Sequence, residues 1–261
     1  KNPMRSTFST SSARACCSLL VAVFCAQAAL ADGENYSLWP RRPAALEEAR
    51  RLMDRGSLAQ ALELLQPLVN QGGVVGREAK DLIGALRIRQ VLDPNGPDVK
   101  EYTVKRGDTW IRMVKKLGCS QAMLVHLNGL MDVPSLQPGD VFKYRPLNFH
   151  VVVNVPEKEV CLYDGENFVK AYSMVAMKDT GRKNFETTVK DEQASFSIYD
   201  KHYPAADKTL LLAAGGYVIE AGNGAPRSPG FYLNRQDCNE LAMLTRPGTK
   251  VTIIREKGTE Q

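Results

Sequence analysis

Histidine and cysteine, the residues that most often ligate transition metals or serve as catalytic bases and nucleophiles, are scarce in this sequence. It has three histidines and six cysteines among 261 residues. His126, His150 and His202 show no spacing typical of a serine protease triad. No C-x-x-C or H-x-x-E pattern indicates a metal site. We therefore expect no metal and no cofactor.

The cysteines are also too few and too unevenly placed for a disulfide framework. Half of them lie within the first 25 residues, and Cys119, Cys161 and Cys238 are spread over the rest of the chain. An odd number of cysteines allows at most one intramolecular pair among these three. Cys238 lies on the same helical face as Leu241, so we expect a buried, inert thiol there.

Acidic residues are absent from the first 31 residues, which we interpret as a secretory signal peptide. Lys1, Arg5 and Arg14 precede a mostly apolar stretch, residues 16–30, and Ala29-Leu30-Ala31 is typical of a cleavage site. The apolar stretch is short for a bilayer span of about 20 residues, which disfavours an uncleaved anchor. We expect export to the periplasm or cell envelope.

The sequence has no large excess of charge outside this segment. Of the net +5, three positive charges lie in residues 1–31, which leaves +2 for the rest. A nearly neutral chain gives no electrostatic reason to expect a nucleic-acid partner.

Residues 43–92 carry apolar side chains at helical spacing, interrupted at Gly56-Ser57 and Gly72-Gly73. The first two helices resemble a tetratricopeptide-type hairpin. Solenoid repeats need about three units to bury a continuous core, so a packing or spacer module is favoured, while recruitment of other envelope proteins stays open as an alternative. Residues 93–98 form a turn-rich linker.

Residues 101–145 contain three short motifs in a fixed order. These are Y-T-V-K-R-G-D-T at 102–109, M-L-V-H-L-N-G-L at 123–130 and L-Q-P-G-D-V at 136–141. Together they resemble a LysM domain, a βααβ carbohydrate-binding module. The resemblance implies a groove for glycan that contains N-acetylglucosamine, lined by Gly107, Asp108, Thr109, Trp110, Asn128, Gly129, Leu130 and Pro134. For Trp110, stacking on a sugar and packing in a core are both open.

From residue 148 the hydrophobic periodicity changes to that of strands separated by short turns, with a loop expected at 199–210. Residues 219–221 read I-E-A, residues 228–234 read S-P-G-F-Y-L-N, and residues 247–253 read P-G-T-K-V-T-I. The layout of residues 148–256 resembles the L,D-transpeptidase domain, a β-rich domain that cross-links peptidoglycan. That family has I-H-G where this chain has residues 219–221, and S-H-G-C-I-R-M where this chain has residues 228–234.

The family's chemistry is missing from these motifs. Acyl transfer needs a nucleophile, a base and donors for the oxyanion. The positions that the resemblance assigns to this machinery, all degenerate here, are Glu220, Ser228, Pro229, Gly230, Phe231 and Leu233. We expect a domain without this catalysis. The alternative is an active L,D-transpeptidase or carboxypeptidase that acts on stem peptides through a non-standard residue.

The predicted fold class is α+β and multidomain. A signal peptide (1–31), a helical segment (43–92), a LysM domain (101–145) and a mostly-β L,D-transpeptidase-like domain (148–256) follow one another. The predicted function is binding of peptidoglycan in the cell envelope.

Overall fold

The computed structural model describes residues 43–131, 133–179, 181, 183–197, 199–222 and 224–256. The predicted signal peptide lies outside these residues. The described residues belong to one compact unit, and no helix among them is apolar over a length that would cross a bilayer.

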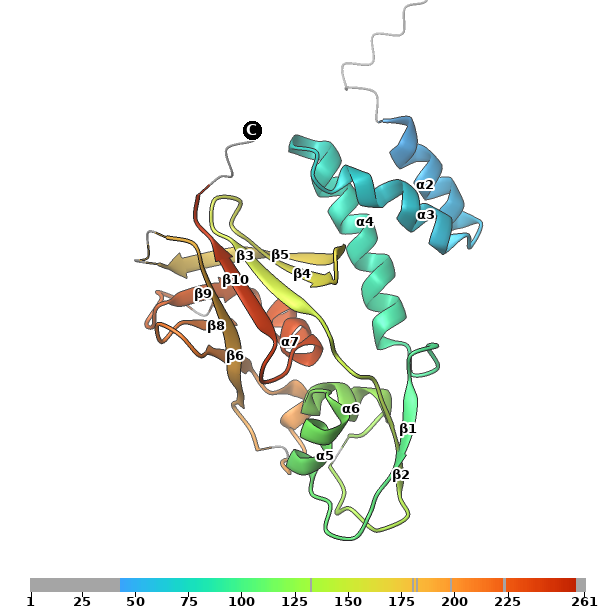
Figure 1. The fold of residues 1–261 in the computed structure, drawn as a ribbon, viewed down its shortest axis with the longest axis vertical. Coiled ribbons are helices and arrows are strands. Elements are labelled where there is room, and N and C mark those ends of the chain that lie inside the picture. Colours follow the sequence, from blue (N-terminus) through green and yellow to red (C-terminus); the bar gives the residue numbers. More distant parts are fainter. Residues whose placement is uncertain are drawn as a thin grey trace, which may run out of the picture. The chain divides into compact units, whose positions relative to one another are not determined.

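Three helices and a short 3-10 turn open the described chain (Figure 1). They are α2 (Ala44–Asp54), α3 (Leu58–Leu65), η1 (Gln66–Leu68) and α4 (Gly73–Leu92). Their apolar faces, including Leu46, Leu65 and Ile83, form a core that also takes in Cys161 and Phe168 of the sheet. At Gly76 a Cβ atom would lie 1.7 Å from the carbonyl oxygen of Gln71, so only glycine fits in the first turns of α4.

The next segment has the order strand, helix, helix, strand. Its elements are β1 (Lys100–Thr103), α5 (Trp110–Leu117), α6 (Gln121–Leu127) and β2 (Val141–Tyr144). The two strands are antiparallel and pair Lys100 with Tyr144. Thr109 and Ser120 cap α5 and α6 by accepting backbone hydrogen bonds, as the polar residues before each apolar run favour.

The remaining strands close into a barrel in the order β10-β3-β4-β5-β9-β8-β7-β6. Their bounds are β3 (His150–Asn154), β4 (Glu159–Asp164), β5 (Asn167–Lys178), β6 (Phe185–Ala194), β7 (Lys208–Leu212), β8 (Val218–Ala221), β9 (Gly230–Leu233) and β10 (Lys250–Ile254). Helix α7 (Arg235–Leu244) follows β9, and η2 (Tyr203–Ala205) precedes β7. Pairs β10–β3 and β8–β9 are parallel, and the other pairs are antiparallel.

The apolar core of the barrel extends to helices α4 and α6 outside it. Ile88 and Val91 of α4 and Met123 and Leu127 of α6 belong to the same buried cluster as the barrel strands and α7. Conversely, Tyr203 beside the barrel joins the core of the 100–145 segment. The segments predicted as separate modules therefore share apolar cores.

The prediction of a mixed helical and strand protein with a mostly-β C-terminal part is confirmed. The identities of residues 43–92 as a tetratricopeptide-like hairpin and of residues 101–145 as a LysM domain stay predictions. The predicted loop at 199–210 is too long, because β7 already begins at Lys208.

Candidate functional site

The degenerate motif lies on two adjacent parallel strands. In the β8–β9 ladder Ile219 pairs with Phe231 and Glu220 with Tyr232. At Gly230 a Cβ atom would come within 2.4 Å of the carbonyl oxygen of Val218, so a side chain there would force the strands apart. The close approach of the two strands therefore explains why residue 230 is a glycine, without any role in catalysis.

Phe231, at the position where the resemblance implies a nucleophile, is a core residue. Its side chain is fully buried among the barrel residues. The ring is stacked on Tyr217, with 5.7 Å between centroids and 12° between planes. A hydrocarbon ring has no lone pair with which to attack a carbonyl, so this position cannot form a covalent intermediate.

A buried ion pair lies directly beyond Tyr217. The Tyr217 hydroxyl donates to Asp179 (2.7 Å), and the Arg255 guanidinium donates to both oxygens of the same carboxylate (2.7 and 2.9 Å). Burial alone would raise the pKa of Asp179, but hydrogen bonds from Arg255, the Gly181 N–H and Tyr217 outweigh it and lower this pKa. Both oxygens of the Asp179 carboxylate are thus used in hydrogen bonds to Arg255 and Tyr217.

At the other degenerate positions the structure shows backbone hydrogen bonds or a partly or fully buried side chain. The Ser228 carbonyl accepts a hydrogen bond from the Tyr232 hydroxyl (2.7 Å), which in turn accepts from the Ser228 N–H (3.2 Å). The Pro229 carbonyl accepts from the Val218 N–H at 3.0 Å. Leu233 is fully buried. Glu220 is half-buried, and its carboxylate adds to the rise that burial causes in the pKa of Tyr232.

No histidine contacts Ser228 in the described part of the chain. His126 Nε2 lies 3.0 Å from the Leu92 carbonyl, His150 is stacked on Tyr163, and His202 Nδ1 lies 2.9 Å from Asp200. A serine hydroxyl without a neighbouring base is a poor nucleophile at neutral pH.

Cys238 is buried and inert, as predicted. Its thiol is fully enclosed and donates to the Lys208 carbonyl at 3.2 Å. Burial raises its pKa to about 12, so the thiolate is scarcely populated near neutral pH. Cys119 and Cys161 are likewise buried, and all three cysteines are free thiols.

The candidate glycan residues lie on two loops, one before α5 and one after α6. Gly107 (φ +88) and Gly129 (φ +59) occupy left-handed turns with no atom within 4 Å of an added Cβ, and Thr109 is exposed. Asp108 accepts from the Tyr102 hydroxyl (2.7 Å) and the Lys105 N–H (2.8 Å), which fixes the first loop. Backbone groups on such open turns are accessible to a polar ligand.

Trp110 joins the two loops from the inside. It is 1% exposed and packs edge-to-face on Phe142 at 5.2 Å. Its indole N–H donates to the carbonyl of Pro134 at 3.0 Å. The structure thus places Trp110 in the core, and the alternative of a rim residue stacked on sugar does not fit its burial.

Asn128 also has a structural role. Its amide group donates to the carbonyls of Leu124 and Lys143 (both 2.8 Å) and accepts from the Lys143 N–H (2.8 Å). These bonds attach the end of α6 to β2. Leu130 and Gly129 line a cavity of about 250 Å³ with Tyr203, Pro204 and Met243, whereas Gly107, Asp108 and Thr109 do not line it.

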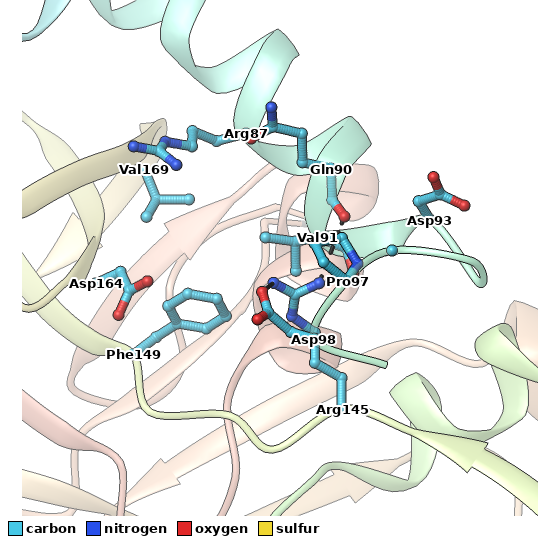
Figure 2. Close-up of a pocket in the computed structure, with 11 residues that line it drawn as sticks. Arg87, Gln90, Val91, Asp93, Pro97, Asp98, Arg145, Phe149, Asp164 and Val169 are labelled. Atoms are coloured by element: carbon cyan, nitrogen blue, oxygen red, sulfur yellow. Dashed lines mark hydrogen bonds and ion pairs between the residues drawn. The ribbon is translucent and has the colours of Figure 1, made fainter. Parts of the chain in front are cut away.

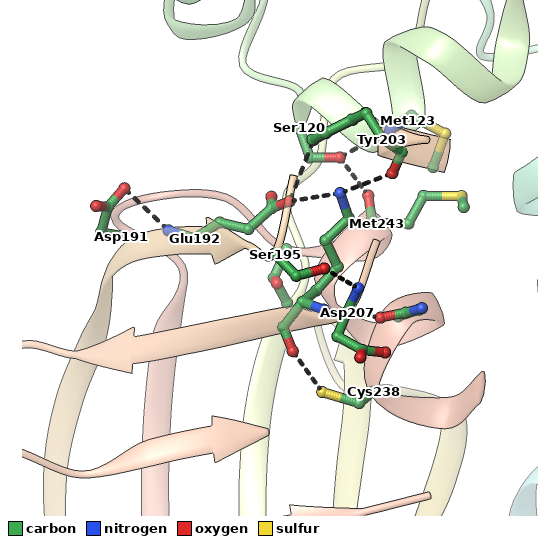
Figure 3. Close-up of polar contacts among 12 residues, drawn as sticks. Ser120, Met123, Asp191, Glu192, Ser195, Tyr203, Asp207, Cys238 and Met243 are labelled. Atoms are coloured by element: carbon green, nitrogen blue, oxygen red, sulfur yellow. Dashed lines mark hydrogen bonds and ion pairs between the residues drawn. The ribbon is translucent and has the colours of Figure 1, made fainter. Parts of the chain in front are cut away.

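A half-buried acid and a buried base lie where the barrel meets the 100–145 segment (Figure 3). Lys208 Nζ lies 4.0 Å from Glu192 Oε1 and 3.2 Å from the ring centroid of Tyr203, whose hydroxyl contacts the same carboxylate at 3.4 Å. Burial raises the pKa of Glu192 to about 7 and lowers that of Lys208 to about 8. Near this pair, the Ser120 hydroxyl at the start of α6 donates to the Met243 carbonyl of α7 at 2.6 Å.

Sequence reasoning missed this cluster for an identifiable reason. Thr187 and Val189 are buried, so strict alternation would turn Asp191 inward. The β6–β7 register instead shifts between Val189 and Asp191, and the resulting bulge leaves Asp191 exposed and Glu192 half-buried. A bulge of this kind has no signature in the local sequence.

No family model matches the sequence, and no curated protein matches it either. Among solved structures, an L,D-transpeptidase from Xylanimonas cellulosilytica is 14% identical, with a TM-score of 0.31, and the match covers 42% of this chain and 65% of that one. An L,D-transpeptidase from Stackebrandtia nassauensis is 10% identical, with a TM-score of 0.33 and coverage of 75% and 78%. One from Enterococcus faecium is 11% identical, with a TM-score of 0.31 and coverage of 67% and 89%. Similarity at this level does not by itself assign a function to the chain.

Proposed function

We propose that this chain is an exported, peptidoglycan-binding protein of the cell envelope whose L,D-transpeptidase-like domain does not catalyse acyl transfer. The observation that carries the second part is the burial of Phe231 against Tyr217 at the nucleophile position. It is supported by the enclosed Cys238 thiol and by the engagement of the described histidines elsewhere.

The proposed glycan site is the pair of loops formed by residues 107–109 and by residues 128–131 with 133–134. Two features support it: the loops present open left-handed turns, and the bond from Trp110 to Pro134 holds them in one arrangement before any ligand arrives. A site whose geometry is already fixed loses less conformational entropy on binding. Trp110 and Asn128 hold the loops in position, and in this proposal Gly107, Thr109, Gly129 and Leu130 touch the sugar.

Co-sedimentation with purified sacculi tests this proposal, using a matched pair of variants. Leu130 and Leu136 are both partly buried against the same apolar cluster, but only Leu130 belongs to the proposed glycan site. We expect Leu130→Gln to weaken sacculus binding by about tenfold, as loss of a buried apolar contact of 1–3 kcal/mol implies. Leu136→Gln should bind like the parent protein despite a similar loss of stability. Equal binding by both variants, or no binding by the parent, would refute the proposed site.

A further inference from the structure

A second cavity, remote from the two loops, lies between α4, the 93–98 linker and the β4–β5 hairpin (Figure 2). Its volume is about 330 Å³, which falls at the lower end of the range for small-ligand sites. Val91, Phe149 and Val169 supply apolar lining, and charged side chains from three separate stretches of the chain complete it.

Three of these charged groups are engaged with the protein itself. Arg145 pairs with Asp98 at 2.5 Å and donates to the Gln90 carbonyl at 3.4 Å. Asp93 accepts from the Asn95 N–H at 2.9 Å, which fixes the turn. These contacts build the wall of the cavity and leave its remaining charges available.

Two opposite charges remain without a partner among the described residues. Arg87 forms no hydrogen bond or ion pair there, and its Nε atom is buried with no acceptor. The Asp164 carboxylate, at the end of β4 beside the β4–β5 turn, is exposed and likewise accepts no hydrogen bond from the described residues. A buried polar atom without a partner is rare in folded proteins, and here the guanidinium that lines the cavity has no counter-charge from the described residues.

We propose that this cavity binds a short zwitterionic peptide. The ligand's carboxylate accepts hydrogen bonds from Arg87, its ammonium group donates to Asp164, and its apolar side chain packs on Phe149 and Val169. An arginine fork suits a carboxylate in geometry and charge. A simple anion would engage only Arg87, and a simple cation would engage only Asp164.

A neighbouring hollow determines how long the ligand can be. It has a volume of about 600 Å³ and shares Arg87 and Gln90 with the first cavity. The buried Oε1 of Gln66, which lines this hollow, also lacks a donor. The ligand is therefore not limited to a single amino acid, because the chain of a longer peptide has room beyond Arg87. This proposal does not depend on glycan binding.

NMR titration of the purified protein with the dipeptide alanyl-leucine tests the proposal. The resonance of the Arg87 Nε–H and the methyl resonances of Val91 and Val169 should shift together and saturate. N-acetyl-alanyl-leucine lacks the ammonium group and alanyl-leucine amide lacks the carboxylate, so each should bind about tenfold more weakly. No shift with alanyl-leucine, or equal affinity for all three peptides, would show that the cavity holds only solvent.

Paired substitutions separate recognition from general charge. Arg87→Gln and Asp164→Asn should each reduce affinity by about tenfold. Arg89→Gln on the same helix and Glu166→Gln on the same turn remove exposed charges outside the cavity and should stay within about twofold of the parent. If Arg87→Gln titrates like Arg89→Gln, the proposal is wrong.

Discussion

The β8–β9 segment and the loops of the 100–145 segment make opposite use of the residues that the resemblances single out. In β9, residues 230–233 are all buried, and Phe231 and Leu233 are core side chains. In the two loops, Gly107, Thr109 and Gly129 remain at the surface. The first segment is therefore part of the core, while the second presents accessible groups on turns that Trp110 and Asn128 hold in place. Under the proposed function, side chains packed in the core offer no group for reaction, whereas groups on open turns stay available for binding.

The largest expected effect comes from removing the ring at position 231, which tests whether Phe231 is a core residue. Phe231→Ala should lower the free energy of unfolding by about 3–5 kcal/mol, because it empties a fully buried site stacked on Tyr217. Urea denaturation measures this change. Phe196→Ala, at an exposed phenylalanine, should cost less than about 0.5 kcal/mol. A cost below about 1 kcal/mol at position 231 would mean that the ring is not a core element.

The second test concerns Trp110, a candidate glycan residue that is buried like the residues of β9. Trp110→Phe should lower stability by about 2 kcal/mol, since it loses volume and the hydrogen bond to the Pro134 carbonyl. Sacculus binding should weaken because the two loops are no longer tied. The exposed neighbour Ile111, changed to Ala, should affect neither property. If Trp110→Phe keeps full stability but loses binding, Trp110 touches the sugar directly.

The smallest expected effect lies at the junction of the two regions, at Glu192. Its pKa of about 7 exceeds the usual value of 4.5, so the native state holds more protons than the unfolded state between these pH values. Stability therefore falls as the pH rises through that window. From pH 5 to pH 7 we expect a loss of about 1–2 kcal/mol from this group, allowing for screening.

Glu192→Gln should abolish this part of the pH dependence, as measured by urea midpoints at pH 5 and pH 7. Glu186→Gln, at an exposed position of the same strand, should leave it intact. An unchanged pH profile in Glu192→Gln would show that the carboxylate titrates like a solvated one, so that the junction is not buried as described.

Local patterns predicted part of this structure well. Apolar periodicity located the helices of residues 43–92, and the burial of Cys238 followed from its place beside Leu241 on α7. Closure of the barrel could not be predicted, because the pairings of β10 with β3 and β6 and of β5 with β9 join strands that are distant in sequence. The same limit applies to the cavity at Arg87, since its lining comes from α4, the linker and two strand ends that are distant in sequence.

The central claim, that the chain binds peptidoglycan without forming a bond to it, is tested most directly by incubating the purified protein with a labelled stem tetrapeptide. Mass spectrometry of the protein and chromatography of the peptide report on adduct and turnover, with an active L,D-transpeptidase run in parallel to show that the substrate is competent. The account predicts neither an acyl adduct nor a change in the peptide. An adduct on Ser228 or Cys238, or turnover that is lost in Ser228→Ala, would contradict it.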